Sequence, residues 1–450
     1  MSHLSVAKFG GTSVANYPAM QSCANIVIAD PNTRVVVLSA SAGVTNLLVA
    51  LANGCEEPER NKLLNEVRQI QENILTELKD DSRVRPKIEA LLANITSLAE
   101  AANLATSLAL TDELISHGEM MSSLIFVEVL RELQIEATWL DVRTIVATNS
   151  HFGKAAPNDE QTRQNCDNLL KPLIERGELV ITQGFIGRDE QGKTTTLGRG
   201  GSDYSAALLA EVLNAQDVLI WTDVAGIYTT DPRIVPNAQR IDTMSFSEAA
   251  EMATFGAKVL HPATLLPAVR SNIPVYVGSS KAPQEGGTWV TRNPQPRPTF
   301  RAIALRRDQT LLTLSSLNML HAQGFLANIF TILAKHKISV DTITTSEVSV
   351  ALTLDKTGSA SSGASLLSEE LLRELSEFCT VKVDVGLSLI ALIGNELHTA
   401  SGVAKRIFET LDAYNIRMIS YGASTNNICL LADSDKADDI VRVLHRSLFE

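Results

Sequence analysis

The sequence predicts an α/β protein: a three-layer αβα domain on a mainly parallel sheet, followed by two small α+β modules. Short apolar, β-branched runs at 34–41, 178–187, 217–224 and 273–280 carry the first part of this prediction. Runs that are apolar throughout are typical of parallel strands buried on both faces. Helical patterns lie between these runs, which places helices on both faces of the sheet. The last third of the chain contains an internal repeat.

Length and composition limit the class of protein. The chain has 450 residues, 45% of them hydrophobic and 20% charged, which indicates a soluble globular protein of two or three domains. A net charge of −12 argues against nucleic acid or an anionic membrane as partner. Five scattered cysteines, with no signal peptide or apolar run of membrane-spanning length, favour a reducing cytoplasm.

The longest helical pattern is "TDELISHGEMMSSLIFVEVLREL", for which we expect a start at Thr111 with acidic residues in the first turn. Further on, "TRNPQPRPTFR" carries three prolines and is typical of a linker. After it, Ile329-Phe330 and Ile407-Phe408 lie 78 residues apart, and this offset aligns a longer stretch. Each copy predicts a strand, a glycine-containing turn, an amphipathic helix and two strands, as in paired modules that bind a ligand or associate. A purely structural dimerisation domain is the alternative.

One motif match is misleading. Gly187, Gly192, Lys193 and Thr194 satisfy the P-loop pattern, and a strand precedes them. A working P-loop opens a helix, whereas "TTTLGRGG" follows here, and its β-branched residues and glycines cannot start one. The acidic pair "DE" inside the loop would also repel a polyphosphate. We therefore predict a β-hairpin.

Two other stretches suit an anion better. In "VAKFGGTSVA", Val6-Ala7 end a short strand, Lys8 supplies a cation and Gly10-Gly11 let backbone N–H groups approach an anion. A plain βα turn is the more frequent explanation for such residues. In "TTTLGRGGSDYSAALLAE", three glycines surround Arg199 before a helix, and an arginine can grip a carboxylate with two hydrogen bonds. Ser202 or Asp203 could equally be an N-cap.

A third stretch, "WTDVAGIYTTDPR", could hold a base and ribose or be a turn-rich loop. Together with "KFGGTS", "LGRGGSD" and "FGAKVLHP" it resembles the aspartokinases of the amino-acid kinase fold, of the monofunctional, lysine-sensitive kind. The repeated units look like that family's two ferredoxin-like ACT domains. The resemblance covers essentially the whole chain. It implies a catalytic domain at 1–292, a linker and first regulatory strand at 293–310, and ACT domains at 311–386 and 387–450.

The resemblance implies an activity and a set of site residues. The family transfers the γ-phosphoryl of ATP, with Mg²⁺, to the β-carboxylate of L-aspartate. That carboxylate is already ionised at neutral pH, so the reaction needs no general base, only positioning and charge neutralisation. The expected catalytic residues are Lys8, Asp203 and Lys258. The expected aspartate-binding residues are Ser39, Thr45, Glu119, Arg199, Gly200, Gly201 and Ser202. The expected nucleotide-binding residues are Lys8, Phe9, Gly10, Gly11, Thr222, Asp223, Tyr228, Arg233, Lys258 and Val259.

Some of these residues also have a simpler structural explanation. Lys258 could be a solvated helix lysine, and Glu119 could lie on a solvated polar face with neighbouring serines. His117 is expected to be a structural histidine. No dense carboxylate cluster suggests a metal cage built by the protein, which fits Mg²⁺ held by phosphates and water.

The first repeat copy carries Asp341 and Glu347, whereas Ile419 and Thr425 stand at the same places in the second. We therefore expect L-lysine to bind the first copy and the second to serve for docking across a homodimer. The expected effector residues are Met319, Phe325, Leu326, Ser339, Val340, Asp341, Ser346 and Glu347. The competing hypotheses are a kinase for another acidic amino acid and a non-catalytic amino-acid sensor.

Overall fold

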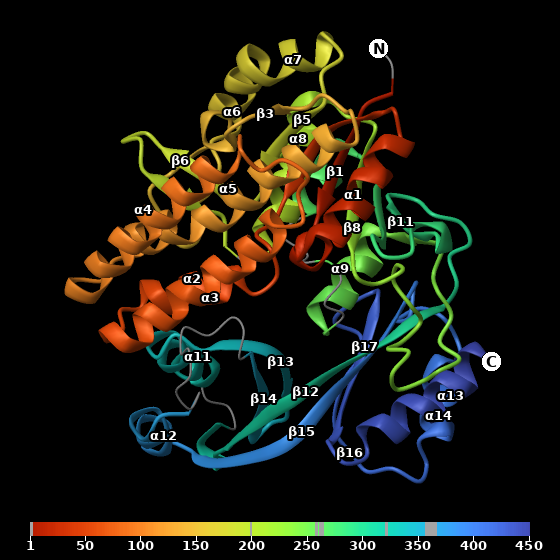
Figure 1. The fold of residues 1–450 in the computed structure, drawn as a ribbon. Coiled ribbons are helices and arrows are strands. Elements are labelled where there is room, and N and C mark those ends of the chain that lie inside the picture. The colour runs from red at the N-terminus through yellow and green to blue at the C-terminus, as the bar shows by residue number, and fades with distance from the viewer. Residues whose placement is uncertain (1–2, 199, 257–259, 261–264, 320–322, 356–366) are drawn as a thin grey trace. The chain divides into compact units, whose positions relative to one another are not determined.

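The computed structural model describes residues 3–198, 200–256, 260, 265–319, 323–355 and 367–450 (Figure 1). The chain forms two compact units. The first contains Met1–Ile227, Arg240–Ala250 and Lys258–Gln295, and the second contains Tyr228–Gln239, Glu251–Ala257 and Pro296–Glu450. The second unit therefore includes two short segments that the sequence analysis assigned to the catalytic domain at 1–292. Local patterns could not show this, because both segments precede the proline-rich linker in the chain.

The first unit is built on an eight-stranded sheet, and six neighbouring strands of it are parallel, as predicted. The seventh strand, β11, is antiparallel to β10, and β9 pairs parallel with β11. The order is β3 (Thr138–Trp139), β5 (Val180–Gln183), β2 (Thr33–Leu38), β1 (Ser5–Phe9), β8 (Asp217–Thr222), β10 (Val275–Ser279), β11 (Gly287–Thr291) and β9 (Thr243–Ser245). The four apolar runs in the sequence supply β2, β5, β8 and β10.

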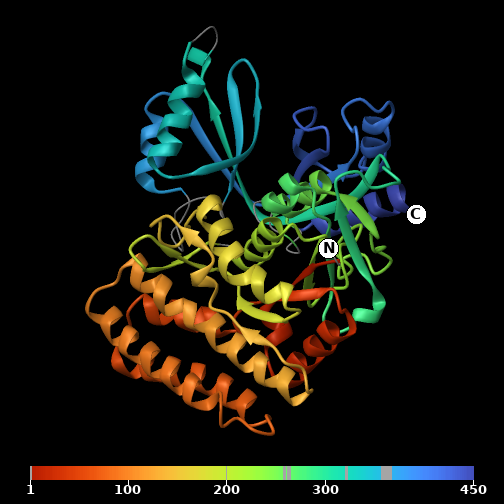
Figure 2. The ribbon, with the colours of Figure 1, turned by 90° about the horizontal axis from the view of Figure 1, so that it is seen from above.

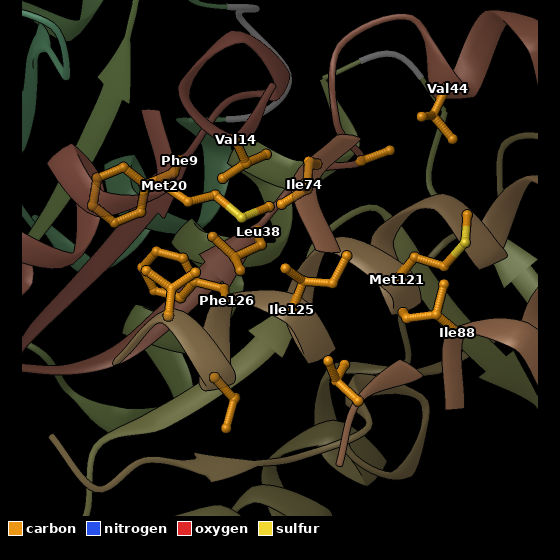
Figure 3. Packing of buried hydrophobic residues seen from close by; sticks show 14 of the residues in the cluster. Phe9, Val14, Met20, Leu38, Val44, Ile74, Ile88, Met121, Ile125 and Phe126 are labelled. Carbon is orange, nitrogen blue, oxygen red and sulfur yellow. The ribbon is translucent and has the colours of Figure 1, made fainter. Parts of the chain in front are cut away.

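Helices cover both faces of this sheet. On one face, Ala7 and Phe9 join a large apolar cluster with five helices, part of which Figure 3 shows around Phe9, Leu38 and Phe126. Lys8 alternates with these residues and points to the opposite face, where α8 packs on β1 and β8. The helices of the cluster are α1 (Tyr17–Ala29), α2 (Val44–Ala52), α3 (Glu57–Leu75), α4 (Arg85–Leu104) and α5 (Leu108–Glu132). The remaining helices of this unit include α6 (Asp159–Asn165), α7 (Lys171–Glu175), α8 (Gly201–Leu213) and α10 (Leu266–Ser271).

The expected start of α5 at Thr111 is wrong. The helix begins at Leu108, because the Ser107 hydroxyl accepts a hydrogen bond of 3.2 Å from the backbone N–H of Leu110 and so caps the first turn. In the view of Figure 2, α3 and α4 lie side by side as long orange helices at the edge of this unit.

The P-loop match is a hairpin, as predicted. β6 (Ile186–Asp189) and β7 (Thr194–Thr196) pair antiparallel and form a small sheet with β4 (Ala147–Thr148). The Asp189 carboxylate accepts hydrogen bonds from the N–H groups of Gln191 and Lys193 and from the Ser150 hydroxyl. Gly192 has a φ of +81°, which favours glycine in the turn. An acidic side chain thus holds the turn closed, and the loop cannot serve as a phosphate cradle.

In the second unit, six antiparallel strands form one sheet. Their order is β13 (Ser339–Thr345), β14 (Ser349–Asp355), β12 (Phe300–Ser315), β15 (Thr380–Gly394), β17 (Asn427–Asp433) and β16 (Ile416–Ser420). The helices that cover it are α11 (Phe325–Lys335), α12 (Glu369–Ser376), α13 (Val403–Thr410) and α14 (Ala437–Phe449). The short helix α9 (Phe246–Thr254) is divided between the two units.

The predicted repeat is present. Gly324 and Gly402 both have a φ of +83° and precede α11 and α13, which begin 78 residues apart. Each long strand, β12 and β15, also runs through both modules. Ile303 of β12 packs with α13 and α14, whereas Leu312 of the same strand packs with α11 and α12. The predicted limits at 310/311 and 386/387 therefore fall inside β12 and β15.

Candidate functional site

The stretches "KFGG", "SASAG" and "WTDV" meet at the carboxyl edge of the parallel sheet. Strand β1 ends in Lys8-Phe9 and runs into Gly10-Gly11, and β2 beside it runs into Ser39. On the other side of β1, strand β8 ends at Thr222. Ligands of open parallel sheets bind outside this edge.

Lys8 and Asp203 form an ion pair. The Lys8 ammonium lies 2.7 Å from Asp203 Oδ1, and the two side chains are 11% and 13% exposed. Asp203 stands in the first turn of α8, where the helix dipole favours a negative charge. The structure thus joins two predicted catalytic residues that are far apart in the sequence.

Gly10 and Gly11 have different roles. The Gly10 N–H, expected to face a phosphate, donates instead to the Trp221 carbonyl at 3.0 Å and so links β1 to β8. A Cβ atom on Gly11 would lie 2.8 Å from the Ala40 carbonyl oxygen, so only glycine allows the turns after β1 and β2 to approach this closely. The Phe9 side chain is fully buried and stacks on Trp221 with ring centroids 6.4 Å apart, so a nucleotide could meet only its backbone.

Glu119 is buried, not solvated. Its side chain lies on α5 and the residue is 3% exposed. One carboxylate oxygen accepts a hydrogen bond of 3.2 Å from the Ala40 N–H, and the other has no partner among the described residues. Burial raises the pKa of this carboxyl to about 8. An unpaired, buried carboxylate oxygen is costly, so this position is suited to receive a cation.

The neighbouring glycine makes this burial possible. A Cβ atom on Gly118 would lie 2.7 Å from the Ala40 Cβ atom, so α5 can approach the turn after β2 only with glycine there. Ser122, one turn further along α5, donates to the Ser39 carbonyl at 2.8 Å. Ser39 itself and Thr45, in the first turn of α2, are half-buried beside this turn.

The start of α8 packs against the turn after β5. A Cβ atom on Gly184 would lie 2.6 Å from the Ser202 Cβ atom, and one on Gly201 would lie 2.6 Å from the Phe185 ring. Phe185 has a φ of +72°, which is strained for a phenylalanine, and its N–H donates to the Ser205 hydroxyl at 2.9 Å. Gly200, with a φ of +71°, precedes the helix. Arg199 lies outside the described residues.

His117 is structural, as expected. Its Nδ1 lies 2.8 Å from the Glu113 carbonyl oxygen and its Nε2 lies 2.9 Å from the Asn94 side-chain nitrogen, so both ring nitrogens have partners. Burial lowers its pKa.

The predicted nucleotide residues are divided between the two units. Thr222 and Asp223 belong to the first unit, where the Thr222 hydroxyl donates to the Asp223 carboxylate at 3.2 Å. Tyr228 and Arg233 belong to the second, and the exposed Arg233 pairs with Asp231 at 2.6 Å. Lys258 and Val259 lie outside the described residues. Nucleotide binding by this motif therefore stays a prediction.

The predicted effector residues fall into two groups. Met319, Phe325 and Val340 pack on the core of the first module, close to Ser339 and Asp341 at the start of β13, while Leu326 beside them is partly exposed. Ser346 and Glu347 follow the other end of that strand, and the Ser346 hydroxyl bonds to the Ser349 hydroxyl at 2.7 Å. Asp341 and Ser346 are five positions apart along extended chain, which is a distance of roughly 16 Å.

The Asp341 carboxylate, expected to be available for a cationic effector, instead forms an ion pair with Arg306 of β12. The Arg306 guanidinium also donates to the Thr254 carbonyl at 3.3 Å. Arg306 is absent from the predicted effector residues, because nothing in the sequence around it indicates an ion pair with Asp341.

The sequence analysis also missed Asp112, a buried carboxylate on α5 that accepts several hydrogen bonds. Its spacing of seven residues from Glu119, two helical turns, was an available signal.

The described part of the chain has neither a metal-binding cluster nor a membrane-spanning helix. No group of three or more His, Cys, Asp or Glu side chains there could hold a metal ion. Likewise, none of the described helices is long and apolar enough to cross a membrane.

Comparisons with known proteins agree with this architecture. The sequence profile of the Amino acid kinase family matches residues 3–279, and a profile of the ACT domain matches residues 390–448. The chain is 62% identical, over the whole of both chains, to the lysine-sensitive aspartokinase 3 of Escherichia coli. It is 35% identical to the chloroplastic aspartokinase 3 of Arabidopsis thaliana, over 99% of this chain and 81% of that protein.

Two solved structures of E. coli aspartokinase III, each 61% identical, match over 100% of both chains. One, in complex with aspartate and ADP in the R-state, has a TM-score of 0.89, and the other, with lysine and aspartate in the T-state, has a TM-score of 0.88. The chain therefore belongs to the amino acid kinase family and, within it, to the aspartokinases.

Proposed function

We propose that this chain transfers the γ-phosphoryl group of ATP to the β-carboxylate of L-aspartate and that L-lysine inhibits the reaction. The observation that carries the proposal is the buried Glu119 carboxylate. One of its oxygens has no partner among the described residues, and it lies beside the same turn that Gly11 contacts. An amino-acid ammonium would supply the missing donors. The solved structures of E. coli aspartokinase III are complexes with aspartate and ADP and with lysine and aspartate.

The substrate's ammonium would change the ionisation of Glu119. With a pKa of about 8, the carboxyl is largely protonated at neutral pH in the free chain. A cation in contact with it favours the ionised form, so binding should release a proton. The β-carboxylate of the substrate is the nucleophile and is already ionised, so no general base is needed.

Lys8 and Asp203 would serve the transferred phosphoryl group. The Lys8 ammonium can stabilise the charge that develops on the phosphoryl oxygens, and Asp203 holds that ammonium in place beforehand. A Mg²⁺ ion bound with ATP would supply further neutralisation. Because the described residues offer no cluster of ligands for it, phosphates and water would hold the ion.

Regulation is proposed for the first module. The lysine side-chain ammonium would compete with the Arg306 guanidinium for Asp341. If Ser346 and Glu347 line the same site, a second chain must supply them, because they lie at the other end of β13. The separation of Asp341 from Ser346 and Glu347 supports a homodimer formed through the ACT modules. We also propose a cytoplasmic location, which suits five unpaired cysteines.

The test is ATP-dependent acyl-phosphate formation from L-aspartate, trapped as the hydroxamate, with and without L-lysine. Glu119→Gln should lose aspartate turnover. Glu128→Gln, on the same helix and paired with Arg131, is the matched control. L-Glutamate and N-acetyl-L-glutamate are tested in parallel. Turnover of either in preference to aspartate would contradict the proposed substrate, and no turnover of any acid would favour the sensor hypothesis.

A further inference from the structure

Asp112 links three parts of the first unit. The residue is 1% exposed and lies on α5. Its carboxylate accepts from the Gly153 N–H, with oxygens at 2.9 and 3.1 Å, and from the N–H and the hydroxyl of Thr196, both at 2.8 Å. One side chain therefore joins α5, the loop after β4 and the end of β7.

Both partners of Asp112 border the loop that leads to α8. Thr196 is the last residue of β7, and its carbonyl accepts from the Ala155 N–H at 2.8 Å. A Cβ atom on Gly198 would lie 3.4 Å from the Gly153 carbonyl oxygen, so Gly198 rests on the Gly153 backbone. Two residues after Gly198, the chain reaches Gly200 and the first turn of α8, where Ser202 and Asp203 stand.

The same helix carries Glu119. The two carboxylates are seven residues apart, so they lie on one face of α5, about two turns or 10.5 Å from each other along the axis. Residues between them are almost wholly buried, which makes this part of α5 a rigid element. The positions of Thr196 and Gly198 are therefore tied to the position of Glu119.

We propose that Asp112 is a positioning residue for the acidic substrate: through Thr196 and Gly153 it holds Gly198 and the start of α8 at a set distance from Glu119. This inference rests on the proposed function, because it assumes that the substrate lies between Glu119 and the start of α8. Asp112 itself would not touch the substrate. Aspartate is suited to the task because both its oxygens accept, whereas asparagine would keep one acceptor oxygen for the backbone N–H groups and place an NH2 group where the Thr196 hydroxyl now donates.

The experiment compares Asp112→Asn with Asp189→Asn in the full chain. Asp189 is the matched control, because it accepts from two backbone N–H groups of the hairpin turn at the opposite end of β7 and from the Ser150 hydroxyl. Asp112→Asn should raise KM for aspartate roughly 10- to 100-fold, the range expected from losing a hydrogen bond to a charged acceptor. KM for ATP should stay within about twofold of wild type, and Asp189→Asn should change neither constant by more than that.

A double-mutant cycle tests whether Asp112 acts through Thr196. Thr196→Val removes the hydroxyl donor and keeps the N–H, so it should raise KM for aspartate severalfold. Combined with Asp112→Asn it should add little further. A rise in KM that is equal for aspartate and ATP, effects that multiply independently, or an unchanged KM with a lowered urea midpoint would each overturn the inference. Tryptophan fluorescence in urea supplies that midpoint.

The outcome is separable from that of the proposed function. A wild-type chain that phosphorylated a different acidic amino acid would refute the proposed substrate, and the inference would then predict the same rise in KM for that acid. A wild-type chain inactive with every acidic amino acid would overturn both.

Discussion

Replacing Glu119 by glutamine should remove a pH-dependent cost of folding. The carboxyl has an ordinary pKa of 4.5, and burial raises it to about 8 in the folded chain. Below pH 4.5 it is protonated in both the folded and the unfolded state, and folding carries no penalty. Between these two values the unfolded chain loses the proton and the folded chain keeps it. The stability of the folded state therefore falls as the pH rises through this window and is level above it.

The magnitude follows from the size of this shift. Each pH unit inside the window costs about 1.4 kcal/mol. From pH 5 to pH 8 the wild-type chain should lose roughly 3 kcal/mol that Glu119→Gln keeps, because glutamine does not ionise. The difference between the two pH values is the test, since a change in hydrogen bonding would add an offset that does not depend on pH.

Urea unfolding followed by tryptophan fluorescence measures this difference in the right part of the molecule. The chain has three tryptophans, and Trp139, Trp221 and Trp289 all belong to the first unit. The signal therefore reports on the unit that contains Glu119. Glu128→Gln, which removes a carboxylate paired with Arg131, is the control. Its free energy of unfolding should not rise relative to wild type between pH 5 and pH 8.

A calorimetric measurement checks the same reasoning with ligand. Aspartate binding to wild type at pH 7 should release close to one proton, seen as a dependence of the binding enthalpy on the buffer's ionisation enthalpy. Free-energy curves against pH that run parallel for wild type and Glu119→Gln would refute the argument. Proton release that persists in a variant still able to bind aspartate would refute it as well.

Three further predictions follow from the site and the modules. Lys8→Met should lower kcat at least about 100-fold, as loss of one transition-state donor does, and steady-state kinetics that show only a higher KM would contradict the proposed role. Gly11→Ala should destabilise the first unit by roughly 1–3 kcal/mol, because its Cβ would meet the Ala40 carbonyl oxygen, whereas Gly10→Ala, with its nearest contact at 3.6 Å, should cost less in the same urea assay. Asp341→Asn should weaken lysine inhibition about tenfold or more with uninhibited kcat unchanged, and an unaltered lysine titration would place the effector elsewhere.

The local sequence pattern was enough to predict those elements whose formation depends on neighbouring residues. Apolar runs buried on both faces became β2, β5, β8 and β10, and the acidic hairpin after β6 was distinguishable from a P-loop by the residues that follow it. The 78-residue offset located α11 and α13, because each copy repeats its own glycine turn and amphipathic helix. Steric and hydrophobic preferences of neighbouring residues decide all of these features.

Contacts between residues far apart in the sequence decide which polar groups of the site are buried and which are paired. On a helix read by itself, Glu119 lies among serines and looks solvated, but the Ala40 N–H and the close approach at Gly118 bury it, across 79 residues of sequence. The Gly10 N–H donates to Trp221, and Arg306 reaches Asp341, for reasons that no local window contains. The sequence alone determined the four apolar strands, the hairpin and the repeated modules. Only the tertiary structure decided which polar groups are left unpaired, because burial and pairing depend on the packing of segments far apart in the chain.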